Sequence, residues 1–331
     1  MANLSIEYAG LHLSSPIVAA SSGLTESVQN IKELEESGVG AVVLKSIFEE
    51  EILMEMEQVE QQMTGKPYIF PETMDYMDDE PHEDLIRKYL RLISDSKQVV
   101  KIPIIASINC ISNQKWTYLA TEIEKAGADA IELNMFSLPS SMDMPAGEIE
   151  AMYLELVEKV VKQVKIPVMV KMSHYYTAMG QMISKFAKTG AKGLVLFNRY
   201  YLPDIDIDEE KIAGAFVLSS PSDIAIPLRW IALMSDSVNV DFAATSGVHN
   251  GESVVKALLA GASTVQIASV IYKNGLGAVE GLNGFVLNWM KTKGYKFISD
   301  FKGKLSYNAD SNPAMWERVQ FMREFRHFIK H

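Results

Sequence analysis

One short unit recurs four times along this chain of 331 residues, and it limits the possible fold more than any other feature. Each copy opens with glycine, continues through apolar residues for about one strand length, and stops on a polar residue. The copies are GVGAVVLKS (38–46), GADAIELN (127–134), GAKGLVLFN (190–198) and GASTVQIAS (261–269). Glycine at this point suits the left-handed position that closes a preceding helix. Each copy therefore predicts a helix followed by a buried strand.

The segments around these units complete a regular alternation of helices and strands. Apolar residues at three- and four-residue spacing predict helices over 26–37, 114–126, 177–189 and 250–260. Four more apolar strands are predicted within 15–23, 100–109, 164–173 and 240–247. Continuous apolar strands separated by helices are typical of a parallel sheet that is covered on both faces. Eight of them predict an α/β fold of the (β/α)8 TIM-barrel type, with residues 1–331 forming a single domain.

Polar residues stand at the predicted ends of all eight strands. In a (β/α)8 barrel the carboxyl ends of the strands meet on one face, and active sites lie there. A polar residue can end any single strand, but two lysines and three asparagines among eight ends predict a shared polar rim. In chain order these ends are Ser21/Ser22, Lys45–Ser46, Asn109, Asn134, Lys171, Asn198, Ser246 and Ser269.

Two connections are much longer than usual, and both follow strands at the predicted active face. Residues 47–99, after strand two, contain an acidic, methionine-rich helical stretch, a Pro- and Gly-marked segment and a further helix. Residues 199–227, after strand six, have the pattern of an extended excursion or hairpin. Both are candidate lids. The tail from 313 to 330 is predicted to be a helix that packs on the barrel.

Composition excludes several classes of function. The net charge of −11 opposes nucleic acid or anionic membrane as a partner, because phosphate binding requires a basic surface. No apolar run reaches the length of a membrane span, and the N-terminus lacks a signal-peptide pattern. One cysteine, Cys110, suits a reducing cytoplasm, and six scattered histidines without paired ligand spacing predict no metal site. We expect a cytoplasmic protein that acts on a small molecule.

The rim residues allow more than one chemistry. Loops after strands seven and eight of such barrels commonly bind phosphate, and Ser246, Gly247 and Ser269 suit that task. Lys45 and Lys171 could stabilise negative charge on a reduced flavin, or a lysine could form a Schiff base as in an aldolase. Either lysine could also be an ordinary surface residue. The rim alone leaves these alternatives open.

The order of several motifs resembles the dihydroorotate dehydrogenase family, which comprises FMN-dependent barrels of pyrimidine synthesis. The resemblance covers residues 3–293 and rests on PIVAASSGLT, VVLKS, ELN, VMVKMSHYY, LFN, TSGVHNG and GASTVQIAS in this order. It implies FMN as cofactor and the soluble, cytosolic, dimeric class. A homodimer is therefore expected, with a soluble electron acceptor such as fumarate. If NAD is the acceptor, a partner subunit must supply that path, since neither a dinucleotide-binding domain nor an iron–sulfur cysteine cluster is recognisable.

The resemblance also implies roles for individual residues. Lys45 would lie at both the flavin ring and the substrate, and Lys171 would contact the N1/O2 edge of the flavin. Asn134 would touch flavin or substrate, and Asn198 would bind substrate. The remaining flavin-binding positions implied are Ala20, Ser21, Ser46, Asn109, Ser246, Gly247, Ala268 and Ser269.

Two loops depart from the pattern of the family. Family members carry a Cys or Ser base in a loop resembling Asn-x-Ser-Cys/Ser-Pro-Asn, whereas NMFSLPS (134–140) is one residue longer between Asn and Pro. Counting from Asn134 puts Ser137 at the base, and counting back from Pro139 puts Leu138 there. The family's asparagine-rich substrate loop after strand two is also missing. Cys110, His174, Tyr175, Tyr176 and water are the other candidates for the proton acceptor.

The function expected from this resemblance is oxidation of dihydroorotate to orotate, with Ser137, Lys45 and Lys171 as catalytic residues. The altered loops keep a second hypothesis open, an FMN oxidoreductase of the same family with another small dihydro or unsaturated substrate. A third is a Schiff-base lyase that uses Lys171.

Overall fold

The fold is a closed parallel barrel surrounded by helices. The computed structural model describes residues 2–52, 54, 85–109, 116–135, 138, 140, 142–199, 203–214, 218–307 and 316. Eight parallel strands form the ring, and the pairings of β13 with β3 and of β4 with β6 close it. The ring consists of β3 (Ile17–Ala19), β4 (Ala41–Val43), β6 (Ile104–Asn109), β7 (Ala130–Asn134), β8 (Val168–Met172), β9 (Gly193–Leu196), β12 (Asp241–Thr245) and β13 (Thr264–Ile267). The predicted (β/α)8 barrel is confirmed.

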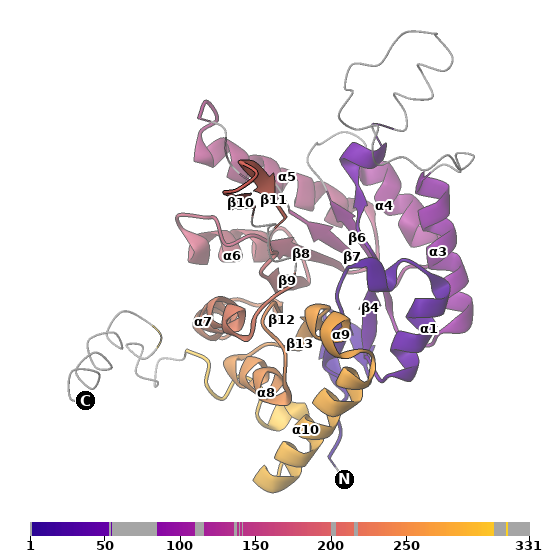
Figure 1. Ribbon diagram of the computed structural model, residues 1–331, viewed down its shortest axis with the longest axis vertical. Coiled ribbons are helices and arrows are strands. Elements are labelled where there is room, and N and C mark those ends of the chain that lie inside the picture. Colours follow the sequence, from indigo (N-terminus) through magenta and orange to yellow (C-terminus); the bar gives the residue numbers. More distant parts are fainter. Residues whose placement is uncertain are drawn as a thin grey trace, which may run out of the picture.

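Helices follow the strands and cover the outside of the ring (Figure 1). They are α1 (Val28–Glu36), α3 (Leu85–Val99), α4 (Trp116–Lys125), α5 (Ala146–Gln163), α6 (Met179–Lys188), α7 (Ala225–Met234), α8 (Gly251–Ala260), α9 (Ser269–Asn274) and α10 (Gly277–Lys293). The four helices predicted before the repeated units are α1, α4, α6 and α8, and their ends lie within two residues of the prediction.

The four glycines that open the repeated units have the predicted left-handed backbone. The φ angles are 92° at Gly38, 96° at Gly127, 96° at Gly190 and 114° at Gly261. A residue with a Cβ rarely adopts this conformation, so glycine permits each helix to turn directly into the next strand.

The strands are shorter than the apolar runs suggested. β3, for example, ends at Ala19 and β4 at Val43, before the polar residues expected to end them, whereas β8 continues one residue past Lys171 to Met172. β6 and β7 do end on the predicted Asn109 and Asn134. Single backbone hydrogen bonds continue just beyond two of these ends, from the N–H of Ala20 to Ile267 and from the N–H of Leu44 to Ile105, so the apolar runs stay attached to the barrel past the assigned strands.

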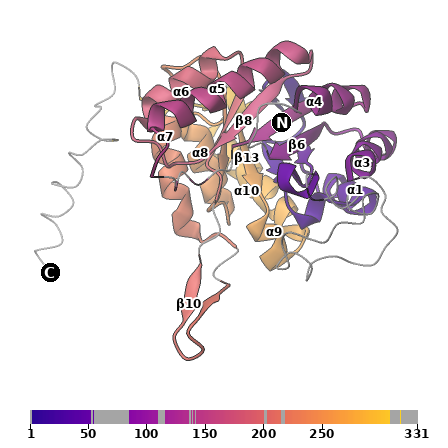
Figure 2. The same ribbon diagram turned by 90° about the horizontal axis from the view of Figure 1, so that it is seen from above.

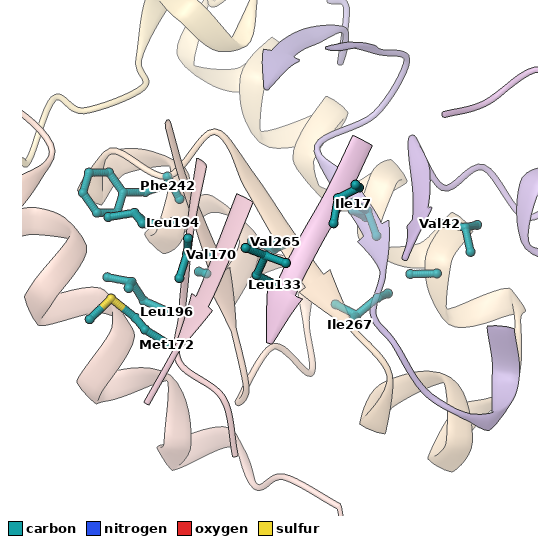
Figure 3. Packing of buried hydrophobic residues seen from close by; sticks show 14 of the residues in the cluster. Ile17, Val42, Leu133, Val170, Met172, Leu194, Leu196, Phe242, Val265 and Ile267 are labelled. Atoms are coloured by element: carbon teal, nitrogen blue, oxygen red, sulfur yellow. The ribbon is translucent and has the colours of Figure 1, made fainter. Parts of the chain in front are cut away.

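Alternation along the strands separates two cores. Outward residues pack against the helices, and Figure 3 shows part of this outer core, in which Phe242 pairs with Leu194 and Met172 with Leu196 on neighbouring strands. The apolar inward residues at the amino end of the ring form a second, smaller cluster with three residues of the N-terminal segment. It consists of Tyr8, Ala9, Leu13, Val18, Ala41, Val43, Ile105, Ala130, Met169, Val195 and Ala243.

An N-terminal hairpin closes the amino end of the barrel, and the sequence patterns did not indicate it. It pairs β1 (Ile6–Tyr8) with β2 (Leu11–Leu13) and buries Tyr8 completely. The N–H of Ala9 donates to the carboxylate of Asp241, at the start of β12, over 2.8 Å. With this end filled, the opposite end remains as the place for a ligand.

The further helix predicted in the first long connection and the hairpin predicted in the second are both present, whereas the short strand β5 (Ile47–Phe48) was not predicted. The connection after the second barrel strand includes β5, which pairs with β6, and later α3. The connection after the sixth carries a hairpin of β10 (Asp204–Asp206) and β11 (Lys211–Ala213), which projects from the barrel (Figure 2). Most of the methionine-rich stretch and of the segment predicted as a tail helix lies outside the described residues.

We predict that Gly40→Ala destabilises the barrel by roughly 3 kcal/mol, because a Cβ there would lie 2.0 Å from the carbonyl oxygen of Ser15, and backbone cannot move aside easily. Gly284→Ala is the matched control, since a Cβ in that exposed position of α10 meets nothing within 4 Å and should stabilise by about 0.5–1 kcal/mol. Urea denaturation measures both. A Gly40→Ala protein as stable as the wild type would contradict the close approach.

Candidate active site at the carboxyl ends of the strands

Three neighbouring strands place the predicted rim residues in one row. Asn109 of β6 is the register partner of Asn134 of β7, and Asn134 is the partner of Lys171 of β8. All three side chains face into the barrel, because the residue that precedes each of them on its strand belongs to the outer core and side chains alternate along a strand. Asn198, just beyond β9, joins the row, and its Nδ2 donates to Oδ1 of Asn134 over 2.7 Å. Parallel register thus brings together four residues that are far apart in the chain.

This row is buried, although its members are polar. Asn109 is 1% exposed, Lys171 is 7% exposed, and Asn134 and Asn198 are each 8% exposed. The amide of Asn198 occupies Oδ1 of Asn134, and no hydrogen bond within the described part of the chain uses Nδ2 of Asn134, which can donate toward a ligand. Oδ1 of Asn109 has no hydrogen-bond partner among the described residues. An unpaired buried amide oxygen is costly, so it marks a position for a ligand donor.

One layer deeper lies a charged group that the sequence analysis missed. Glu132 of β7 is fully buried, and its Oε2 accepts a hydrogen bond of 2.5 Å from Nε2 of Gln266. Its Oε1 is 3.8 Å from Nζ of Lys171. The available signal was the alternation of β7, since Glu132 stands two residues before Asn134 and must face the same way.

Serine hydroxyls form a second chain on the other side of the mouth. Oγ of Ser21 is 3.1 Å from Oγ of Ser46, which is 2.7 Å from Oγ of Ser107 inside the barrel. Ser21 and Ser46 were predicted at the flavin, and Ser107 was not predicted. The hydroxyl of Tyr89, on α3, donates to the carbonyl of Ser107 and accepts from its N–H. Burial raises the pKa of Tyr89, so the phenol stays protonated at neutral pH and keeps the long connection anchored to this wall.

Lys45 and Ala20 lie on the same side as the serines but differ in exposure. Nζ of Lys45 forms an ion pair of 2.9 Å with Glu26, and both side chains are half exposed. Such a pair contributes only about 0–1 kcal/mol, so the lysine can leave it for a ligand. Ala20 is buried, and its N–H donates to the carbonyl of Ile267. Ala20 therefore lies beside the end of β13 and the predicted position Ala268.

The predicted phosphate positions form a tight turn and a helix start. Ser246 and Gly247 both have left-handed backbone, with φ angles of 71° and 76°. Among the described residues, no hydrogen bond uses the N–H of Gly247 or Val248. Ala268 precedes Ser269, the first residue of α9. Free backbone donors beside small side chains are the features by which such loops hold phosphate.

The long connection after β9 returns to cover this turn, which the sequence did not reveal. The N–H of Ser219 donates to Oγ of Ser269 over 2.9 Å, and Nζ of Lys273 donates to the carbonyl of Ser219 over 2.8 Å. A Cβ on Gly247 would lie 2.1 Å from the backbone nitrogen of Ile224. Glycine at 247 is therefore required by this close packing as well as by its φ angle.

Two histidines border the site. Nε2 of His249 is 3.0 Å from Oγ of Ser219, and burial together with the charge of Lys273 lowers the pKa of His249. His174 follows β8, stacks on Tyr175 with ring centroids 4.4 Å apart, and has its pKa lowered by burial. Both imidazoles are therefore mainly neutral at pH 7, and each can accept or donate a hydrogen bond.

The loop that would supply the base is only partly described. Ser137 and Cys110 lie outside the described residues, so Ser137 remains a prediction from the sequence. Met135 is buried, and its N–H donates to the carbonyl of Lys171 over 2.9 Å. Leu138 is 57% exposed. The loop thus leaves the barrel directly beside Lys171.

The residues present suit a flavin. Its pyrimidine edge carries one N–H donor and two carbonyl acceptors, and the mouth offers complementary groups. Oδ1 of Asn109 is a buried oxygen without a partner in the described part of the chain, while Asn134 and Lys171 supply donors. The free N–H groups at Gly247 and Val248 suit the phosphate. The described residues contain no group of three His, Cys, Asp or Glu that could hold a metal.

Known proteins are similar to this chain over most of its length. Residues 73–284 match the family described as dihydroorotate dehydrogenase. The catalytic subunit of dihydroorotate dehydrogenase B (NAD(+)) from Thermoplasma volcanium is 25% identical over 316 residues, which cover 92% of this chain and 98% of that protein. A putative dihydroorotate dehydrogenase A (fumarate) from Aeropyrum pernix is 27% identical over 91% of this chain and 96% of its own length.

A third relative differs in its named activity. The NAD-dependent dihydropyrimidine dehydrogenase subunit PreA of Escherichia coli is 26% identical over 326 residues, 92% of this chain and 77% of that protein. No helix among the described residues is long and apolar enough to cross a membrane. The family match covers well over half of the chain and agrees with the observed barrel. This chain belongs to the dihydroorotate dehydrogenase family and is a flavin-dependent oxidoreductase that acts on CH–CH bonds.

Proposed function

We propose that this chain binds FMN at the mouth of the barrel and oxidises dihydroorotate to orotate, with a soluble acceptor such as fumarate. The observation that carries the proposal is the buried row of Asn109, Asn134 and Lys171, joined by Asn198. It combines amide donors and acceptors with one cation, as a planar cyclic amide and a flavin edge require. The family relationship removes support for the Schiff-base alternative.

Bound FMN would supply the chemistry of accepting a hydride from the substrate. The protein then has three tasks at the same mouth. Asn134 and Asn198 hold and orient the substrate through their amides, and the mutual hydrogen bond fixes which atoms face it. Lys171 stabilises negative charge at the flavin's pyrimidine edge. Ser137 takes the proton from the carbon next to the one that gives up the hydride, and passes this proton to a neighbouring group or to water.

The phosphate of FMN would lie on the turn at Ser246–Val248 and the start of α9, covered by Ser219. Gly247 is a poor place to test this, because any side chain there also displaces Ile224. Ser246 is better, since Asp and Asn both tolerate its left-handed backbone.

We predict that Ser246→Asp weakens FMN binding by about 100-fold, since a carboxylate about 5 Å from phosphate costs roughly 3 kcal/mol at an effective dielectric constant of 20. Ser246→Asn has nearly the same shape without the charge and should stay within a few-fold of wild type. Fluorescence titration of the apoprotein with FMN measures both. Equal affinities for the two variants would place the phosphate elsewhere.

We predict that Ser137→Ala slows flavin reduction by dihydroorotate by about two to four orders of magnitude, the range for a positioned proton acceptor. Ser137→Cys keeps an acceptor and should recover much of the rate. Anaerobic stopped-flow absorbance measures the bleaching of the flavin, and FMN content should be equal in all three proteins. A fast Ser137→Ala enzyme would transfer the role to His174, Tyr175, Tyr176, Cys110 or water.

A second candidate substrate is a dihydropyrimidine without a carboxylate. It is favoured by the altered loop after the second strand and by the relationship to PreA, whose name describes a dihydropyrimidine dehydrogenase subunit. The two substrates differ in charge, and Lys45 is the half-exposed rim cation that resemblance assigns to the substrate.

We predict that dihydroorotate reduces the flavin faster than dihydrouracil does, and that Lys45→Met raises the apparent Kd for dihydroorotate by about tenfold through loss of a charge-assisted hydrogen bond. Binding of dihydrouracil should be unchanged in this variant. Anaerobic titration of each substrate against flavin absorbance gives the comparison. Reduction by dihydrouracil alone would establish the second candidate instead.

By the same resemblance we propose a cytoplasmic homodimer. Light scattering coupled to size-exclusion chromatography gives the mass in solution, and a monomer would reject the dimer. Reoxidation of the reduced enzyme by fumarate, compared with NAD+, tests the acceptor. Two relatives are named as subunits, so reoxidation by neither compound would point to a partner protein as the acceptor.

A further inference from the structure

Glu132 is a buried charge that the proposed function does not yet use. It lies in the middle of β7, its side chain is 0% exposed, and its neighbours Ile131 and Leu133 face the outer core. A carboxylate inside a closed barrel loses its hydration, which costs several kcal/mol unless nearby groups compensate. Its surroundings must therefore explain why it is there.

Among the described residues, the side chains that bond or pair with Glu132 are one amide and one cation. Nε2 of Gln266 donates to Oε2 over 2.5 Å, and Nζ of Lys171 lies 3.8 Å from Oε1, the oxygen that has no hydrogen bond among the described residues. Within the described chain, Lys171 is the one cation that forms an ion pair with Glu132. Gln266 therefore holds the carboxylate on one side, while the distance between the carboxylate and Lys171 can still shorten.

The register shows where this pair lies relative to the mouth. Glu132 is the partner of Met169, whereas Lys171 is the partner of Asn134, two residues further along β7. The carboxylate consequently lies one layer below the lysine, on the side away from the mouth. A ligand above the lysine and Glu132 below it compete for the same ammonium group.

We propose that Glu132 is a positioning residue for Lys171. Its carboxylate attracts the ammonium from below and offsets part of its charge, so it sets how strongly Lys171 stabilises negative charge on the flavin. Gln266 controls the offset by keeping the carboxylate from closing fully on the lysine. This inference rests on the proposed binding of FMN at the mouth.

The sulfite adduct of the flavin provides a readout that does not depend on any substrate. Sulfite adds through sulfur to N5 of the oxidised flavin, and the displaced electron pair becomes a negative charge on the N1–C2 carbonyl edge. A more positive environment at that edge lowers the Kd for sulfite and raises the midpoint potential of the flavin. Both are measured by absorbance on the purified holoprotein.

Glu132→Gln is the central variant, since it removes the charge but keeps the shape. The new amide has an acceptor available, because Oε1 of Gln266 has no partner among the described residues. With the offset gone, we expect the Kd for sulfite to fall at least about tenfold, which corresponds to a rise of about 30 mV for a two-electron couple. Glu132→Asp retains the charge at a greater distance from Lys171 and should lower the Kd for sulfite less than Glu132→Gln does.

Gln266→Met tests the effect of Glu132 on Lys171 by a change that should shift the sulfite Kd in the opposite direction. Without the amide, the carboxylate is free to approach Lys171 more closely, so we expect the Kd for sulfite to rise and the potential to fall. Glu150→Gln is the matched control, because it breaks a Glu–Lys pair of 3.0 Å with Lys185 on the outer helices. It should leave both values unchanged.

The outcomes separate this inference from the proposed function. A wild-type protein that binds no FMN rejects the proposed function before Glu132 is tested. If the wild type binds FMN and Glu132→Gln has the same sulfite Kd and midpoint potential as the wild type, the positioning role is rejected and the flavin site is retained. If Glu132→Gln does not fold, Gln266→Met decides the question. An unchanged sulfite Kd in Gln266→Met rejects the positioning role of Glu132, and a raised Kd supports it.

Discussion

Closure of the parallel ladder is the constraint on which the rest of this structure depends. The pairings of β13 with β3 and of β4 with β6 complete the ring, and every inward side chain is then enclosed by strands and by the helices outside them. In such an interior a polar atom must find a protein partner or a ligand. A polar side chain inside the barrel therefore indicates a specific partner or ligand, whereas a polar side chain on an open surface does not.

The interior changes in character from one end to the other. Tyr8 and Leu13 fill the amino end beneath a layer of apolar side chains. Glu132 and its partner Gln266 follow, and the row of Lys171 and the asparagines lies at the mouth. The apolar plug isolates the charged layer from solvent on one side. Electrostatic effects at the mouth are consequently stronger than they would be in water, which is the condition under which one lysine can influence a bound cofactor.

Both long connections are joined to this mouth by specific hydrogen bonds. Tyr89 of α3 bonds the backbone of Ser107 in β6, while Ser219 bonds Ser269 at the start of α9. The first connection uses the phenol of Tyr89, and the second uses the backbone N–H of Ser219. Loops carried by a rigid barrel can vary without altering the barrel itself.

The sequence by itself determined the barrel, the order of its strands and the rim. Gly38, Gly127, Gly190 and Gly261 mark helix ends through a local requirement for left-handed backbone, and apolar runs mark strands through burial, so both could be recognised without a structure. Only the tertiary structure decided which distant residues meet. The Glu132–Lys171 pair and the cover of Ser219 over Ser269 depend on strand register and on the path of a long connection. Neither is encoded in local spacing, because they arise from residues that contact one another only after the ring has closed.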